Sequence, residues 1–256
     1  MKKLLIRLAI AVVVLVILGI LAMRLFLDSA VKRGIETVGP MVTKVEVKLD
    51  SVNLSLLSGS GKVKGLVVGN PQGYKMPSAI QVGSATLALQ PSSVFADKVV
   101  IKTIQVQAPE ITFETDLKGN NLSTILANLQ AATGGQANQA QAEKPAKAGK
   151  KLEVDDFLIT GAKLHVSVSA LAGQSATVPL PEIHLTDLGK GPDGITAAEL
   201  AQIVLKAIEK EAVQASSGAV ASLSKQAAGL TKGLGNGATG AVDQVTKDLG
   251  GLFKKK

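Results

Sequence analysis

An unbroken apolar run near the N-terminus constrains this chain more than any other feature. Residues 8–23 carry no polar or charged side chain, and residues 4–27 are interrupted only by Arg7 and Arg24. A helix needs roughly 20 mostly apolar residues to cross a hydrocarbon core of about 30 Å. The two arginines lie near the ends of the run, where long side chains can reach the membrane interface. The sequence therefore predicts a single transmembrane anchor.

The apolar run has two other interpretations. A cleaved signal peptide has a shorter apolar core, of about 7–15 residues, followed by small residues at the cleavage site. Here Asp28 stands where a small residue is needed. A buried helix of a soluble core is disfavoured because residues 8–23 present no polar face. An uncleaved signal anchor is the favoured interpretation, with the short N-terminus in the cytoplasm and the remaining chain outside it.

The net charge of +8 does not indicate a nucleic-acid-binding surface. Residues 1–33 contribute +5 and the last three lysines contribute +3, so residues 34–253 are neutral overall. A nucleic-acid-binding domain carries its basic patch on the fold itself, so we expect no nucleic-acid partner. The chain has no cysteine, which excludes disulfides and thiolate catalysis. Aromatic residues make up only 2% of the chain, so its core must be aliphatic.

After the anchor, apolar and polar residues alternate with the two-residue period of strands. Roughly ten strands are predicted, and side by side they would extend over about 50 Å. The alternation changes phase after Gly83 and again after Pro109, as a β-bulge would cause. The predicted fold class is α+β and mainly β, with a strongly curved antiparallel sheet.

Two helices and several boundaries follow from local signals. Asn121 is predicted to cap a short helix, and Thr196 with Glu199 forms a capping-box pattern that opens a second one. For the Gly/Ala-rich end of the chain, disorder is favoured over a weakly amphipathic helix lying on a membrane. The predicted segments are residues 1–33 (cytoplasmic tail and anchor), 34–130 (curved β-domain), 131–150 (low-complexity linker), 151–190 (continuation of the sheet), 191–216 (amphipathic helix) and 217–256 (tail).

A weak internal repeat links two strands. Residues 98–108 parallel residues 151–161 at an offset of 53, and each segment is followed by a further strand. The alternative is that any two strand pairs resemble one another.

No pattern indicates catalysis. The two histidines, His165 and His184, fall on the polar phase of predicted strands, and no nucleophile elbow or metal-ligand spacing occurs. We therefore expect no enzyme activity, no cofactor and no metal.

An ordered set of short motifs resembles the AsmA-like family of bacterial envelope proteins. It comprises the turn Gly69-Asn70-Pro71-Gln72-Gly73-Tyr74, the strand that ends at Pro109, and Gly119-Asn-Asn121-Leu122 opening a helix. With the N-terminal anchor, the resemblance covers roughly residues 1–130. It implies an inner-membrane protein, single-pass, with its bulk in the periplasm of a bacterium.

The larger members of that family resemble chorein-type bridge proteins, which curl a sheet into a groove for lipid acyl chains. The resemblance implies a non-enzymatic role in envelope lipid handling, lipid transport or outer-membrane maintenance and biogenesis. This chain is too short for a bridge, so a lipid-binding or capping module is expected. The alternative is a structural scaffold or interaction module of an envelope complex without lipid cargo. Expected partners are the bilayer, phospholipid acyl chains and other envelope proteins. The residues predicted to line the apolar groove are Val45, Val47, Leu87, Leu89, Ile104 and Val106.

Overall fold

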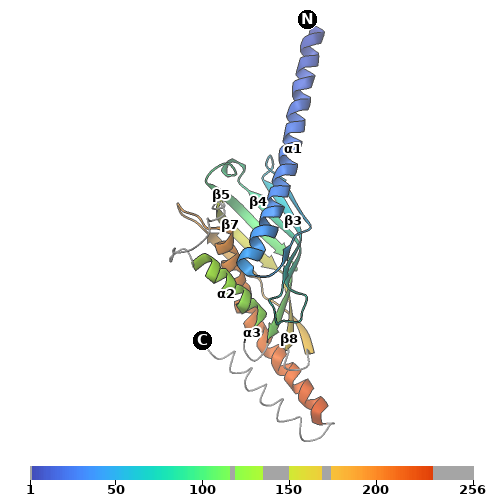
Figure 1. The fold of residues 1–256 in the computed structure, drawn as a ribbon, viewed down its shortest axis with the longest axis vertical. Helices are drawn as coiled ribbons and strands as arrows, with labels where there is room; N and C mark the ends of the chain where they lie inside the picture. Colours follow the sequence, from blue (N-terminus) through green and yellow to red (C-terminus); the bar gives the residue numbers. More distant parts are fainter. Residues whose placement is uncertain (1, 116–118, 135–149, 169–173, 233–256) are drawn as a thin grey trace.

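The computed structural model describes the backbone of residues 2–115, 119–134, 150–168 and 174–232. Side chains are described for nearly all of these residues between 26 and 223, and before residue 26 at only a few positions. This described part is mainly β, with one curled sheet shaped like half a barrel and three α-helices (Figure 1). The helices are α1 (Lys2–Thr43), α2 (Asn121–Gly134) and α3 (Ala197–Lys232), with a short 3-10 turn, η1 (Pro91–Ser93). The strands are β1 (Val47–Lys48), β2 (Ser51–Ser55), β3 (Ser60–Gly69), β4 (Ser78–Leu89), β5 (Lys98–Gln107), β6 (Glu110–Thr115), β7 (Lys151–Thr160), β8 (Lys163–Val168), β9 (Gln174–Pro179) and β10 (Ile183–Leu188).

The ten strands share only six positions across the sheet, because several of them follow one another end to end. From one edge of the sheet to the other, the first position is shared by β1 and β2, and the next two are β3 and β4. The last three positions are shared by β5 and β6, by β7 and β8, and by β10 and β9. Six positions at a strand spacing of about 4.8 Å span about 24 Å. The predicted extent of ten strands side by side is therefore wrong.

The sheet is mixed, so the prediction of an antiparallel sheet is also wrong. β5 pairs with β7 in parallel, and β6 pairs with β8 in parallel, while the remaining pairs are antiparallel. After β6 the chain passes through α2 and returns to the end of the sheet where β5 begins. Such a crossover places the next strand parallel to the previous one.

The weak sequence repeat corresponds to this parallel register. Lys98 pairs with Lys151, Gln107 with Thr160 and Glu110 with Lys163, so the offset of 53 is kept from β5 into β6. Both repeats bend at the same place, where Ala108 has a φ of 47° and Gly161 a φ of 64°. The two halves of the repeat therefore lie side by side and bend together.

Two rows of irregular backbone explain why the sheet curls. One row runs from Gly65, with a φ of 64°, past Gly83 to Ala108 and Gly161, and both predicted phase changes fall on it. The second row crosses β5, β7 and β10, where the pairing skips a residue and Asp187 has a φ of 56°. Irregularities of this kind bend strands and increase their twist.

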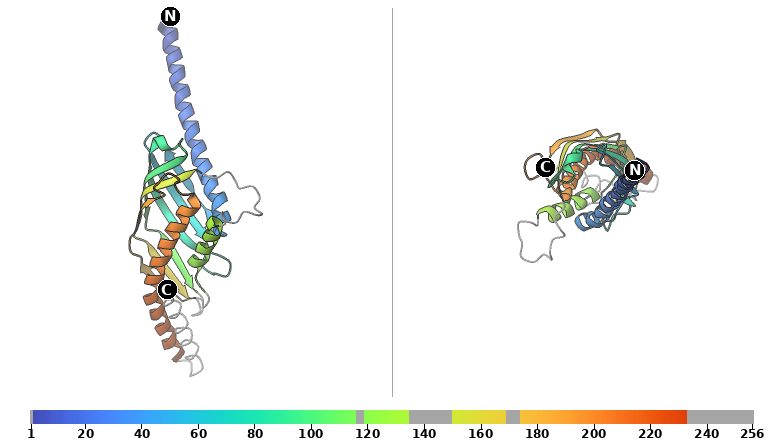
Figure 2. Two further views of the ribbon diagram at one scale, coloured as in Figure 1. Left: turned by 90° about the vertical axis from the view of Figure 1, so that its left-hand side faces the viewer. Right: turned by 90° about the horizontal axis from the view of Figure 1, so that it is seen from above.

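Helices α2 and α3 lie against the concave side of the arc (Figure 2). Their buried residues pack on residues of β4 to β10 and form one core, which is aliphatic except for Phe113 and Phe157. Residues from α2 in this core are Leu122, Ile125, Leu126 and Leu129; those from α3 include Leu205, Ile208 and Ala212; those from the sheet include Phe113, Val154 and Leu164.

Helix α3 begins as predicted and ends later than predicted. The Thr196 amide donates to Glu199 Oε2 at 2.6 Å, and the Glu199 amide donates to Thr196 Oγ1 at 3.1 Å, which confirms the capping box. The helix continues past residue 216 to Lys232, because Ala219, Val220 and Leu223 are buried in the core. The remainder of the predicted tail, residues 233–256, lies outside the described residues. The predicted linker is likewise helical up to Gly134, and its residues 135–149 are not described.

Helix α1 continues beyond the predicted anchor boundary at residue 33, because its second half packs along the first edge of the sheet. Leu27, Val31 and Ile35 contact a small cluster formed by Leu49, Val52 and Leu54. Polar side chains of the same helix turns bind the backbone of the edge strands. Asp28 accepts from the Leu54 amide at 2.7 Å, Glu36 accepts from the Leu49 amide at 3.1 Å, and Lys32 donates to the Asp50 carbonyl at 2.9 Å. The helix thereby covers a strand edge that would otherwise be open to pairing.

The first half of α1 projects away from the body (Figures 1 and 2). Its described apolar side chains Ile10, Val14, Leu15 and Leu18 are 47–67% exposed. When only the described residues are counted, no helix is both long enough and apolar enough to span a membrane.

Candidate functional site

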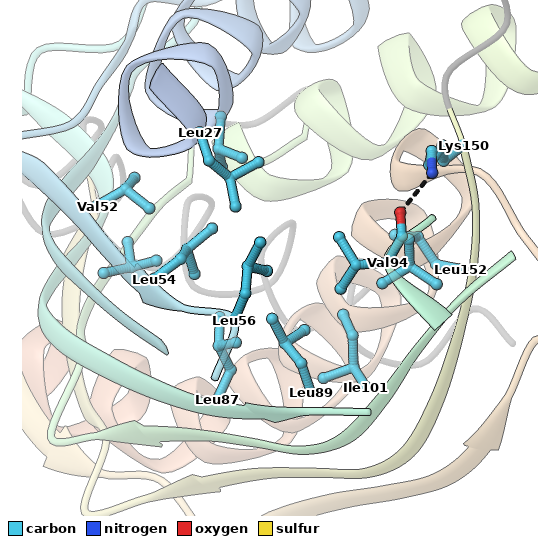
Figure 3. A pocket seen from close by; sticks show the side chains of 13 residues that line it. Leu27, Val52, Leu54, Leu56, Leu87, Leu89, Val94, Ile101, Lys150 and Leu152 are labelled. Carbon is cyan, nitrogen blue, oxygen red and sulfur yellow. Dashed lines mark hydrogen bonds between the residues drawn. The ribbon is translucent and has the colours of Figure 1, made fainter. Parts of the chain in front are cut away.

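A cavity of about 340 Å³ lies between the second half of α1 and the sheet (Figure 3). It sits at the end of the sheet where β2 and β4 finish and where β5 and β7 begin. Residues from α1, from β2 to β5, from β7 and from three connecting segments line it. They are Leu27, Val31, Val52, Leu54, Leu56, Val63, Leu87, Leu89, Val94, Val99, Ile101, Lys150 and Leu152.

The chemistry of this lining is almost uniform, since every lining residue except Lys150 is a leucine, valine or isoleucine. The Lys150 ammonium donates hydrogen bonds to the carbonyls of Val94 and Ala96, the latter at 3.1 Å (Figure 3). Its side chain therefore contributes a methylene stem and one positive charge at the border of the cavity. A site of this composition can bind an aliphatic group.

The cavity exists because the helices cover the concave face unevenly. Helices α2 and α3 pack on the core that involves β4 to β10, whereas among the described residues the edge at β2 packs against α1. Gly61 of β3 pairs with Leu54 and with Leu87. A Cβ built on Gly61 would approach side-chain atoms of both leucines to 2.6 Å. The missing side chain at this position lets the two leucines lie close together in the cavity wall.

The six predicted groove residues lie in three environments. Leu87 and Leu89 line the cavity. Val45 and Val106 are 6% and 8% exposed and belong to the main core, against which Ile104 also packs. Val47 is buried next to Gly39 of α1. The structure therefore brings only two of the six to the cavity.

The residues that sequence reasoning missed carry two recognisable signals. Leu27 and Val31 follow the apolar run of residues 8–23 and lie four residues apart, which is the spacing of one helix face. Val52, Leu54 and Leu56 form one apolar strand phase. Neither signal says that the helix face and the strand face stay apart far enough to leave a cavity.

The turn at residues 69–74, which carries part of the resemblance to the AsmA-like family, belongs to a buried polar cluster away from the cavity. The Asn70 amide donates to the Met76 carbonyl, and Asn121 donates to Asn70 Oδ1, both at 2.7 Å. Asn121 also donates to the Thr112 carbonyl at 2.9 Å and accepts from the Glu114 amide at 3.0 Å. The predicted helix cap at Asn121 is wrong. Its neighbour Asn120 accepts from the Ser123 amide at 2.7 Å, three residues ahead, as a helix N-cap does.

The other motif residues also have structural roles. The buried Glu114 carboxylate accepts from the amides of Lys75 and Met76, each at 2.9 Å, and so holds the segment after the turn. The Gly69 amide donates to the Glu46 carbonyl at 2.8 Å, and Gly73 has a φ of 98°. The Pro109 carbonyl accepts from the Lys163 amide at 2.9 Å, next to the bend at Ala108. Pro71 is buried in the same turn.

The histidines and most paired charges lie on strands rather than in the cavity. His184 Nε2 lies 2.5 Å from Asp156 Oδ1, and His165 Nδ1 lies 2.9 Å from Thr177 Oγ1. Both histidine contacts are exposed, as solvated surface pairs are. Within the described ranges, no three His, Asp or Glu side chains come together as metal ligands would.

Comparison with known proteins identified no relative of this chain. No family model, curated protein or solved structure matches the chain.

Proposed function

We propose that this chain is a non-enzymatic, membrane-anchored protein of the bacterial cell envelope, of AsmA-like type, that holds lipid acyl chains in the cavity between α1 and the sheet. The single observation that carries the proposal is the lining of that cavity. Twelve of its thirteen residues are aliphatic, and the thirteenth is a lysine at the border.

An acyl chain is the ligand that this chemistry favours. Ligand sites of roughly 300–1,000 Å³ are usual, but most contain several polar groups that orient the ligand. A lining without such groups selects for length and apolarity, and each buried methylene contributes about 0.8 kcal/mol. An anionic or polar headgroup would remain outside, on the side of the Lys150 ammonium.

The membrane anchor is proposed from the sequence and from the position of the cavity. The apolar run ends at Met23, and Leu27 of the same helix already lines the cavity. Four residues of α-helix rise about 6 Å. A lipid in the adjoining leaflet would therefore have only a short distance to move. The exposed apolar side chains of the first half of α1 are a surface that needs a membrane or partner to cover it.

The dimensions of the sheet favour a lipid-holding module over a conduit. Its six strand positions span about 24 Å, and α2 and α3 cover much of the concave face. The same cover favours the second candidate, a structural scaffold of an envelope complex without lipid cargo. In that case the cavity would stay empty.

Photochemical labelling separates the two candidates. The full-length chain is placed in lipid nanodiscs that contain a phospholipid with a diazirine in its acyl chain, and adducts are located by mass spectrometry after illumination. Lipid in the cavity gives adducts on residues of β2 and β4, such as Leu54 and Leu89. Adducts confined to residues before Leu27 would reflect bilayer contact alone and would favour the scaffold.

A matched pair of substitutions provides the control. Leu87, Ile104, Phe157 and Leu185 follow one another in a single row across the sheet. Leu87 lines the cavity, whereas Leu185 packs on the main core at the other end of the row, and both are half-buried. L87D is expected to abolish the adducts on β2 and β4, and L185D is expected to preserve them. Far-UV circular dichroism of both variants verifies the fold.

A further inference from the structure

Two bulky apolar side chains are exposed at one end of the sheet. Leu57, in the turn between β2 and β3, is 82% exposed, and Phe95, in the segment between β4 and β5, is 76% exposed. Neither contributes to either hydrophobic cluster. A single exposed apolar residue is ordinary, but two at neighbouring loop tips form a surface that calls for an explanation.

The two loops that carry them lie side by side. The Leu89 amide donates to the Gly59 carbonyl at 2.5 Å, which joins the β2–β3 turn to the end of β4. A Cβ built on Gly59 would lie 3.1 Å from the Pro91 ring. Within the second loop, Val94 lines the cavity while its neighbour Phe95 is exposed. Lys150 binds the carbonyls on both sides of Phe95 and adds a positive charge there.

This end of the sheet is level with the point where α1 leaves the body. Along the covered edge, Glu36 binds Leu49 and Asp28 binds Leu54, so strand numbers rise as helix numbers fall. Continuing the same relation places the β2–β3 turn beside the part of α1 that precedes Asp28, where Phe26 is 76% exposed. Figures 1 and 2 show the loops before β3 and β5 at the end of the body from which the first half of α1 projects.

We propose that Leu57 and Phe95 form a membrane-docking rim, defined here as these two side chains, that inserts into the bilayer interface around α1. The inference rests on the proposed membrane anchor, and it adds how the domain is oriented. The cavity end faces the bilayer, and the turn at residues 70–73, at the opposite end of β3, points away from it.

A bilayer explains the rim better than a partner protein. The rim lies at the end of the body from which the apolar first half of α1 projects, so one bilayer would cover both surfaces. Leucine and phenylalanine tips with a lysine beside them are the residue types that lie in membrane interfaces, where the apolar part is buried and the ammonium reaches the headgroups.

The absence of cysteine makes the rim directly testable. Single-cysteine variants L57C and F95C of the full-length chain are labelled with the fluorophore NBD and reconstituted in vesicles of phosphatidylethanolamine and phosphatidylglycerol. Q72C, in the exposed turn at the opposite end, is the matched control, and L15C reports on the apolar run. Each label is exposed to a quencher attached to lipid acyl chains and, separately, to aqueous iodide.

The expected result is loss of fluorescence with the lipid-borne quencher at residues 57 and 95, with protection from iodide, and the reverse at residue 72. If residue 15 is quenched by lipid but residue 57 or residue 95 stays accessible to iodide, the anchor stands and the docking rim is overturned. Quenching at residue 72 equal to that at the rim would also overturn the proposed orientation. If residue 15 itself remains in water, the membrane anchor fails, and the rim fails with it.

Discussion

Asn121 offers the sharpest test of the structure, because the sequence and the structure assign it different roles. The sequence pattern predicts that Asn121 caps a helix. In the structure the residue is fully buried, with a relative exposure of 0%, and its side chain joins three segments. It donates to Asn70 Oδ1 and to the Thr112 carbonyl, and it accepts from the Glu114 amide.

The expected cost of N121A follows from the partners left behind. The substitution removes three hydrogen bonds and leaves two acceptors and one backbone donor without this partner in a buried setting. Each unsatisfied buried group costs about 1–3 kcal/mol, and neighbouring terms are not additive. We therefore expect a loss of about 3–5 kcal/mol in the free energy of unfolding. The true cap, Asn120, makes one capping bond, to the Ser123 amide, and the loss of this bond in N120A should cost about 1 kcal/mol.

Thermal unfolding followed by far-UV circular dichroism measures both variants. The chain has no tryptophan and one tyrosine, so intrinsic fluorescence is a poor probe. For a domain of this size 1 kcal/mol corresponds to about 2–4 °C in Tm. N121A should lower Tm by at least about 6 °C and N120A by about 2–4 °C. Equal shifts, or a larger shift for N120A, would refute the buried cluster and restore Asn121 as the cap.

Two further substitutions test the packing of α3 and α1. Burial raises the pKa of the Glu209 carboxyl above its ordinary value of 4.5. Its folded form therefore favours the proton, and stability is lost as pH rises through the raised pKa. E209Q should raise Tm at pH 7, and the gain should vanish below about pH 4; a gain that persists at acid pH would contradict the assignment. D28A removes the acceptor of the Leu54 amide, should cost about 1–3 kcal/mol, and should speed hydrogen exchange at Leu54. Unchanged exchange there would mean that α1 does not cover the strand edge.

Much of the local structure was predictable from the sequence because its causes are local. The strand alternation, the two phase changes and the capping box at Thr196 depend on residues within a few positions of one another. The repeat at an offset of 53 was also visible, although its meaning as a parallel register was not. The pairing direction depends on where the chain returns after α2, which no local pattern encodes.

The errors have a common physical origin in tertiary burial. Glycine and serine lower helix propensity after residue 216, yet burial of Ala219, Val220 and Leu223 keeps α3 helical to Lys232. Asn120 and Asn121 are both of a residue type that caps helices well. Only the positions of Asn70 and Thr112 determine which of the two side chains is buried. In the same way, an aliphatic strand face predicts that apolar groups cover it. It does not indicate whether a helix packs directly on that face or leaves a cavity beside it.

Helix α1 connects the two proposals because one rigid element makes three kinds of contact. Its first half carries the apolar run, while Asp28 and Glu36 bind the edge-strand backbone and Leu27 and Val31 form one wall of the cavity. The helix is continuous from Lys2 to Thr43, so the wall and the run share one axis. A ligand that widened the cavity would have to tilt this helix or break its bonds to the edge strands. Occupancy of the cavity should therefore change hydrogen exchange at Leu49 and Leu54 before it changes exchange in the core under α2 and α3.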